Sequence, residues 1–221
     1  MPEYRTEPLI VPYVSGLLPE GERNRRVALT SFSNRHETHR VPMRDIICYE
    51  CGRSSQVPAA ALSANCIHCH AHLNMADVEL RCGSTRCTVS TLGDITLLSD
   101  AVLSHLNLTC RDLHVLGKGV GAVRCSRKMT VQGSFRQVGK FRVRELEVCR
   151  GGELRFETPV ELGQASINGL VVGDITAEGD VRIRRHGILR GHCHAARLII
   201  EPGGRQEDLP EPRSAPGPRP F

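Results

Sequence analysis

Tryptophan is absent from this sequence, and aromatic residues of all kinds make up only 4% of its 221 residues. A core organised around large rings is therefore excluded, so the interior has to be built from Val, Ile, Leu and Ala. Hydrophobic residues still amount to 40%, enough for a packed core, and 21 glycines provide many tight turns. This composition favours a repetitive β structure over an aromatic-cored globule.

Long apolar runs are also missing. No stretch approaches the roughly 20 apolar residues that a membrane-spanning helix needs. The first residues, MPEYRTEPLIVPYVSG, show no basic stretch followed by a long apolar core, so we expect no secretory signal. We therefore expect a cytoplasmic protein whose ten cysteines remain reduced. The net charge of +5 permits an anionic partner but does not require one, because an ordinary surface with excess Arg explains it as well.

Lasting periodicity is lacking at both ends of the chain. Residues 1–43 are charged and turn-prone, and residues 205–221 are rich in proline, so we predict a disordered arm and a disordered tail. Residues 8–18 (PLIVPYVSGLL) form the one apolar patch of the arm. This patch fits a peptide that touches a membrane or docks on a partner, and it fits equally a segment that packs on the neighbouring domain. Membrane association therefore remains an open alternative for the arm.

Two CxxC pairs are the strongest motif in the sequence. Fourteen residues separate the pairs, which consist of Cys48, Cys51, Cys66 and Cys69. Two residues between paired cysteines let both sulfurs reach one ion at about 2.3 Å, so the spacing predicts a tetrahedral zinc site. Four thiolates leave no open position for a catalytic water, so the Zn²⁺ is structural and stabilises a small zinc ribbon of paired hairpins over residues 44–80. Disulfides are disfavoured because the expected compartment is reducing. A redox-active CxxC motif is disfavoured because it would not need a second CxxC pair. Three histidines beside the second pair are expected to be exposed: His68, His70 and His72.

Residues 87–204 are repetitive. Apolar–x–apolar triplets recur about every 17 residues, and most are followed by a glycine within two to four residues. The phrase Gly-Asp-Ile-Thr also occurs twice, at 93–96 and 173–176. The five clearest triplets are 113–115, 129–131, 146–148, 181–183 and 198–200.

Short strands at this spacing predict a parallel β-solenoid. Each coil of about 17–18 residues would place three strands around a triangle, with Val, Ile and Leu pointing inward and Gly at the corners. A Greek-key sandwich would not explain the sustained repeat. The fold class is therefore mainly β, with a zinc ribbon followed by a β-helix and disordered ends. Within the solenoid, the scattered cysteines at 110, 125, 149 and 193 are interpreted as thiols that act as small hydrophobic residues.

Catalytic motifs are absent from the sequence, which contains no GxSxG, no HExxH, no Walker loop and no GxGxxG that opens a helix. His192 and His194 flank Cys193, but on a strand the thiol points away from both rings, which argues against a nucleophilic pair. We therefore predict that the protein is not an enzyme. Basic residues on the polar face form either a stripe for an acidic partner or the charge that any solenoid needs to stay soluble. They are Arg124, Arg127, Lys128, Arg142, Arg144, Arg182, Arg184 and Arg185.

Residues 173–191 (GDITAEGDVRIRRHGILRG) and 195–204 (AARLIIEPGG) resemble the repeat of bactofilins, and a weaker similarity extends over the solenoid. The resemblance implies a right-handed parallel β-helix that polymerises without nucleotide into non-polar filaments by stacking its ends. It also implies a bacterial cytoskeletal scaffold that localises cell-wall or chromosome-organising proteins. The zinc ribbon and the long N-terminal arm depart from the plain family pattern.

The open ends of a β-helix offer unpaired backbone groups, so exposed ends invite pairing. We expect end-to-end contact through Leu198, Ile199 and Ile200. Two other functional classes remain as alternatives. A left-handed hexapeptide-repeat acyltransferase would show glycine every sixth residue, which this chain does not. A nucleic-acid-binding zinc ribbon would be expected to carry more basic and aromatic residues than this one, so nucleic acid is the less favoured partner.

Overall fold

The computed structural model describes residues 41–82 and 88–208, and within them every regular element is a β-strand. The predicted mainly-β class is confirmed. Residues 8–18 and most of the predicted arm and tail lie outside the described residues.

A four-cysteine module, residues 43–75, is made of two short hairpins. β1 (Met43–Ile47) pairs antiparallel with β2 (Ser54–Pro58), and β3 (Ser63–Asn65) pairs antiparallel with β4 (His72–Asn74). Their buried side chains form a core of their own that includes Ile46, Val57 and Leu73. The paired hairpins predicted from the cysteine spacing are confirmed.

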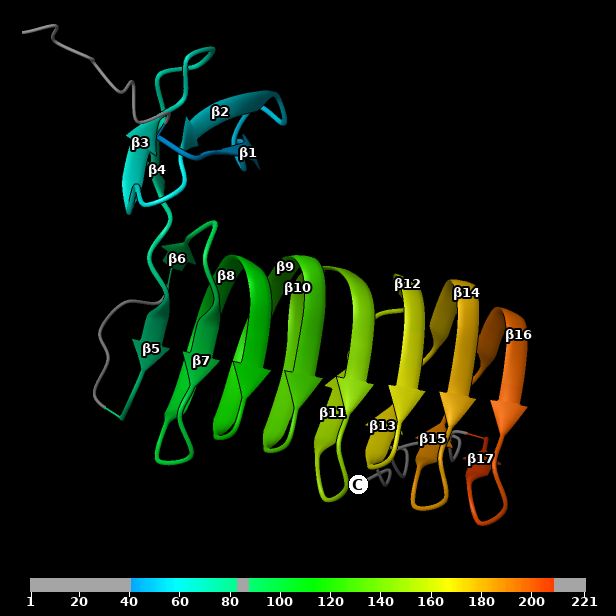
Figure 1. The fold of residues 1–221 in the computed structure, drawn as a ribbon. Helices are drawn as coiled ribbons and strands as arrows, with labels where there is room; N and C mark the ends of the chain where they lie inside the picture. The colour runs from blue at the N-terminus through cyan, green and yellow to red at the C-terminus, as the bar shows by residue number, and fades with distance from the viewer. Residues whose placement is uncertain (1–40, 83–87, 209–221) are drawn as a thin grey trace, which may run out of the picture. The chain divides into compact units, whose positions relative to one another are not determined.

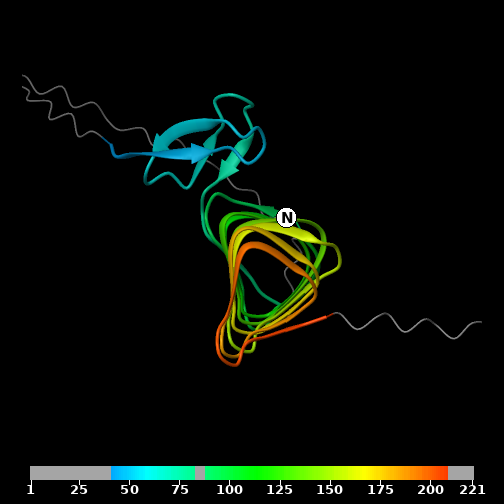
Figure 2. The same ribbon diagram turned by 90° about the vertical axis from the view of Figure 1, so that its right-hand side faces the viewer.

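The remaining strands form one 13-stranded sheet in which every pairing is parallel. Figure 1 shows them stacked side by side, and Figure 2, which looks along the stack, shows the coils superposed as a triangle. The predicted parallel solenoid is therefore confirmed, and its right-handedness stays a prediction. The strands are β5 (Val78–Leu80), β6 (Thr88–Ser90), β7 (Ile95–Leu97), β8 (Val102–Val115), β9 (Lys118–Val131), β10 (Ser134–Val148), β11 (Glu153–Phe156), β12 (Val160–Ile167), β13 (Leu170–Val172), β14 (Ile175–Ile183), β15 (Ile188–Arg190), β16 (Cys193–Ile200) and β17 (Arg205–Glu207).

One side of the triangle, here called the triplet face, carries all the predicted apolar triplets in register. The second apolar residues of successive coils are 16 to 19 residues apart and form one inward column: Leu80, Leu97, Val115, Val131, Val148, Ile167, Ile183 and Ile200. All members from Leu97 to Ile183 are completely buried. The triplet face is thus a stack of equivalent inward apolar pairs, as the alternation predicts.

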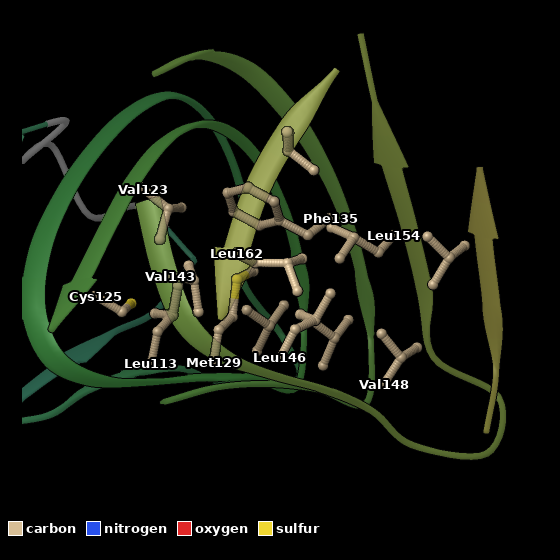
Figure 3. Packing of buried hydrophobic residues seen from close by; sticks show 14 of the residues in the cluster. Leu113, Val123, Cys125, Met129, Phe135, Val143, Leu146, Val148, Leu154 and Leu162 are labelled. Atoms are coloured by element: carbon tan, nitrogen blue, oxygen red, sulfur yellow. The ribbon is translucent and has the colours of Figure 1, made fainter. Parts of the chain in front are cut away.

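A second column lies on another side of the triangle. Phe135, Leu154 and Val171 follow one another on β10, β11 and β13 and are buried. Figure 3 shows Phe135 and Leu154 pointing into the same interior as Met129 and Leu146 from the triplet face. The interior is therefore filled mainly by aliphatic side chains, with the buried rings of Phe135 and Phe156 among them.

Corner aspartates tie neighbouring coils together. Asp77 Oδ1 accepts the amide of Asp94 at 2.8 Å, and Asp174 Oδ1 accepts the amide of His192 at 2.9 Å. Asp94 and Asp174 are the aspartates of the two Gly-Asp-Ile-Thr phrases. The carboxylate of the second phrase therefore satisfies a backbone amide of the next coil, whereas the Asp94 carboxylate of the first phrase accepts hydrogen bonds from the Arg111 side chain.

The predicted domain boundaries need correction at both ends of the solenoid. Val78 to Leu80 were assigned to the ribbon over 44–80, yet β5 pairs with β7 and starts the solenoid before the predicted residue 87. Arg205 to Glu207 were assigned to the tail over 205–221, yet they form β17 and pair with β15. β17 lacks apolar residues, so its pattern gives no strand signal, and backbone pairing to the preceding coil determines its conformation.

Candidate metal centre and assembly surface

The two cysteine pairs sit in turns of the same construction. The amide of Gly52 donates to Cys48 O and the amide of His70 donates to Cys66 O, both at 2.9 Å. Gly52 and His70 occupy equivalent left-handed positions, with φ of 72° and 61°. Each hairpin therefore ends in a matching knuckle that turns its two thiols inward.

The geometry of the four sulfur atoms fits one tetrahedral ion. All four Sγ atoms lie within 4.8 Å of one another, and both the Cys48–Cys69 and the Cys51–Cys66 Sγ pairs are 3.7 Å apart. A tetrahedron with metal–sulfur bonds of about 2.3 Å has edges of about 3.8 Å. A disulfide would need about 2.05 Å. The four cysteines therefore form a cluster that could hold one metal ion, and the structure brings together all four predicted ligands.

Backbone amides prepare these sulfurs to carry negative charge. The amides of Glu50 and Cys51 point at Cys48 Sγ, at 3.4 and 3.5 Å. Hydrogen bonds from the amides of Cys69 and His68 lower the pKa of the Cys66 thiol to about 6. At Cys69 the amide of Ala71 acts in the same direction, but burial and the adjacent sulfurs outweigh it and raise the pKa to about 12. Crowded thiols without a cation resist joint ionisation, so a bound cation is what would allow all four to lose their protons.

The neighbouring histidines are not part of the cluster. His68 and His72 are exposed, and their rings contact Ser54 O and Asn65 Oδ1. His70 is exposed as well. The expectation that the three histidines are exposed is confirmed.

The scattered solenoid cysteines mostly face the interior. Cys110 and Cys125 are buried on adjacent coils with their Sγ atoms 3.4 Å apart. The contact from Cys110, together with burial, raises the pKa of the Cys125 thiol, which keeps it protonated. Cys193 occupies the position of Ile175 one coil earlier and is half-buried. These thiols act as small hydrophobic residues, as predicted.

His192 and His194 do not form a nucleophilic site with Cys193. Both rings are exposed, and the His192 ring lies 3.2 Å from Asp174 Oδ1 on the outside, whereas Cys193 packs against the core. The described residues thus show the divergent geometry expected on a strand.

The last coil, formed by β16 and β17, presents an open apolar end. Leu198 and Ile200 continue the inward columns of Val181 and Ile183. Val181 and Ile183 are completely buried, whereas Leu198 is 37% exposed and Ile200 is 47% exposed. Ile199 aligns with Arg182 and points to the outer surface. Of the three residues predicted to form the interface, two side chains therefore lie on the open core and one lies on the rim.

The predicted basic stripe divides into separate groups. Arg124 and Arg142 are neighbours on β9 and β10. Lys128 contacts Glu145 and Glu147 on the triplet face, and Arg127 is paired with Asp112. Arg182 lies on β14, and Arg184 and Arg185 follow directly after that strand. The Arg184 side chain donates a hydrogen bond to Ser166 Oγ. Arg144 lies on β10. Acidic partners therefore hold Arg127 and Lys128 of this set, and the stripe for an acidic partner stays a prediction.

No helix that is long and apolar enough to cross a membrane is found in the described residues. Comparison of the chain with protein-family models, with curated proteins and with solved structures gives no match.

Proposed function

We propose that this protein is a non-enzymatic scaffold that self-assembles by stacking its solenoid end to end, with a structural zinc ion in the four-cysteine module. The proposal follows the resemblance of residues 173–204 to bactofilins. On that basis the protein would act in the bacterial cytoplasm and recruit cell-wall or chromosome-organising proteins.

The observation that carries the proposal is the exposure of Leu198 and Ile200 at an unpaired strand edge. Each belongs to a column whose inner members are buried, and among the described strands β16 pairs with β14 alone. A strand edge with apolar side chains is a template for further pairing unless something covers it. Because 37% of Leu198 and 47% of Ile200 is still exposed, covering them completely favours association by about 1 kcal/mol each.

The support for zinc comes from the donor set. Four thiolates in tetrahedral arrangement select Zn²⁺ over the hard cations Mg²⁺ and Ca²⁺, which prefer oxygen. The residues that would hold it are Cys48, Cys51, Cys66 and Cys69. The ion would stabilise the fold of the module, because the module has only a few core residues beyond the cysteines.

Sedimentation of a Leu198→Arg, Ile200→Arg double variant tests the assembly. The parent chain is expected to sediment as an assembly and the variant as a single folded chain. The matched control is a Thr96→Arg, Thr130→Arg variant, which adds the same charge to the outer surface of the triplet face, away from the end. If the end variant sediments like the parent while its circular dichroism shows a folded chain, this interface is wrong.

A further inference from the structure

The two ends of the solenoid differ in how far their apolar columns are open. Leu80 in the first coil is only 2% exposed, and Val89 on β6 is 7% exposed. In the last coil the equivalent column ends in Ile200, which is 47% exposed. On the triplet face, the described C-terminal end therefore leaves more apolar surface to bury than the N-terminal end does.

This asymmetry disfavours a filament of either polarity. In a head-to-tail filament the open end of one copy would have to cover the first coil of the next copy, and in the non-polar filament that the resemblance implies two first coils would have to meet. Leu80 is already covered, so that contact would gain little apolar burial on its side. Growth needs two adhesive ends, and on the triplet face the described residues offer one.

We propose that two copies of this chain pair through their C-terminal coils about a two-fold axis and that the assembly closes at two. This inference rests on the proposed self-assembly and specifies its partner and its size. A two-fold axis makes the two β16 strands run antiparallel, and each copy then uses the same surface.

One antiparallel register fits the side chains of β16 better than its neighbours. If Ile199 faces Ile199 of the second copy, Leu198 faces Ile200 and Ile200 faces Leu198, so the exposed column ends cover each other. A shift of two residues would place Ile200 opposite Ala196, or Leu198 opposite Pro202, which has no amide hydrogen. The first register therefore buries the most apolar surface.

The same register is complementary in charge. It sets Arg197 opposite Glu201 of the second copy, and the two-fold axis repeats this pair. The Arg197 side chain is 71% exposed and its ion pair with Asp180 is long, at 4.0 Å, so a closer carboxylate can compete for it. A hydrogen bond of 2.8 Å from the backbone amide of Glu201 to Ile183 O holds Glu201 beside the strand end. Opposite charges directly across strands stabilise a pair, whereas like charges oppose it.

Charge exchange on the full chain tests this arrangement, with association measured by sedimentation equilibrium. Arg197→Glu alone should weaken pairing by about tenfold, because it sets Glu against Glu201 twice, and Glu201→Arg alone should do the same. The double variant Arg197→Glu, Glu201→Arg should restore pairing to within about threefold of the parent. Failure of the double variant to recover would overturn the proposed register and two-fold contact.

The size of the parent assembly separates this inference from the proposed function. Two copies, lost in the Leu198→Arg, Ile200→Arg variant, support both. Assemblies longer than two copies that are lost in that variant keep the proposed self-assembly and overturn closure at two. A parent chain that stays single at all concentrations overturns both.

Discussion

The ring of Phe135 occupies the space that a side chain at Gly119 would need. The two residues face each other on β10 and β9, and a Cβ at Gly119 would come within 2.8 Å of two ring carbons. The one large aromatic group in this part of the interior thus depends on a missing side chain one coil earlier.

Gly119→Ala is therefore expected to destabilise the solenoid by about 1–3 kcal/mol through overpacking. Phe135→Leu alone should also destabilise it, since it leaves a cavity. The double variant should lose less than the sum of the two, because Leu vacates the space that the new methyl group needs. Urea denaturation of the three variants measures this coupling, and strict additivity would contradict the packing relation.

Asp112 should give the solenoid a measurable acid sensitivity. Its buried carboxylate accepts hydrogen bonds from Arg127 and from the amide of Lys128, and the Arg127 contact lowers its pKa in spite of burial. A carboxylate whose pKa is lowered in the folded state contributes stability above its unfolded pKa of about 4, and this stability is lost as pH falls toward the folded pKa. Asp112→Asn should lower the free energy of unfolding at pH 7 and flatten its fall below pH 5. Asp45→Asn, at an exposed position, controls for the loss of one charge, and an equal effect of the two variants would contradict the prediction.

Metal removal should act on the four-cysteine module. We expect one zinc per chain by elemental analysis, with Cys51→Ser and Cys66→Ser each lowering affinity by at least a hundredfold. Affinity should also fall as pH is lowered, because protons compete for the thiolates. Co²⁺ in place of Zn²⁺ gives a thiolate absorption band that reports the same equilibrium. Cys82→Ser, at an exposed cysteine outside the cluster, should leave the band unchanged.

The two knuckles should respond differently to alanine. Gly52 has a left-handed φ and no atom within 4 Å of an added Cβ, so Gly52→Ala costs about 1 kcal/mol of backbone strain alone. Because folding and metal binding are linked, zinc affinity should fall about fivefold. His70 already holds the equivalent conformation with a side chain, so His70→Ala should change affinity less than twofold. Equal losses of zinc affinity in the two variants would contradict this prediction and would show that steric or ligand effects dominate over backbone strain.

The sequence predicted the triplet face well because its inward positions hold two aliphatic residues in nearly every coil. The triplet at 165–167 was not recognised, since Ala165 is a weak apolar signal and the coils on either side differ in length by three residues. The second column was harder to recognise, because Gly119 interrupts it between Leu103 and Phe135 and Gln206 stands in line after Leu189. The cysteine cluster followed from spacing alone. The sequence could not predict which basic residues form ion pairs with acidic residues of the adjacent coils, because that depends on where each coil turns.

Because equivalent inward apolar pairs stack on one another, the length of the solenoid can be changed without changing its ends. Each coil contacts only the coils before and after it, and adds about 4.8 Å along the axis. An extra coil inserted between β12 and β14 would meet its neighbours through the same columns and leave Leu198 and Ile200 unchanged. The solenoid can therefore serve as a molecular ruler, whose number of coils sets the distance from its first strand to the surface at its last.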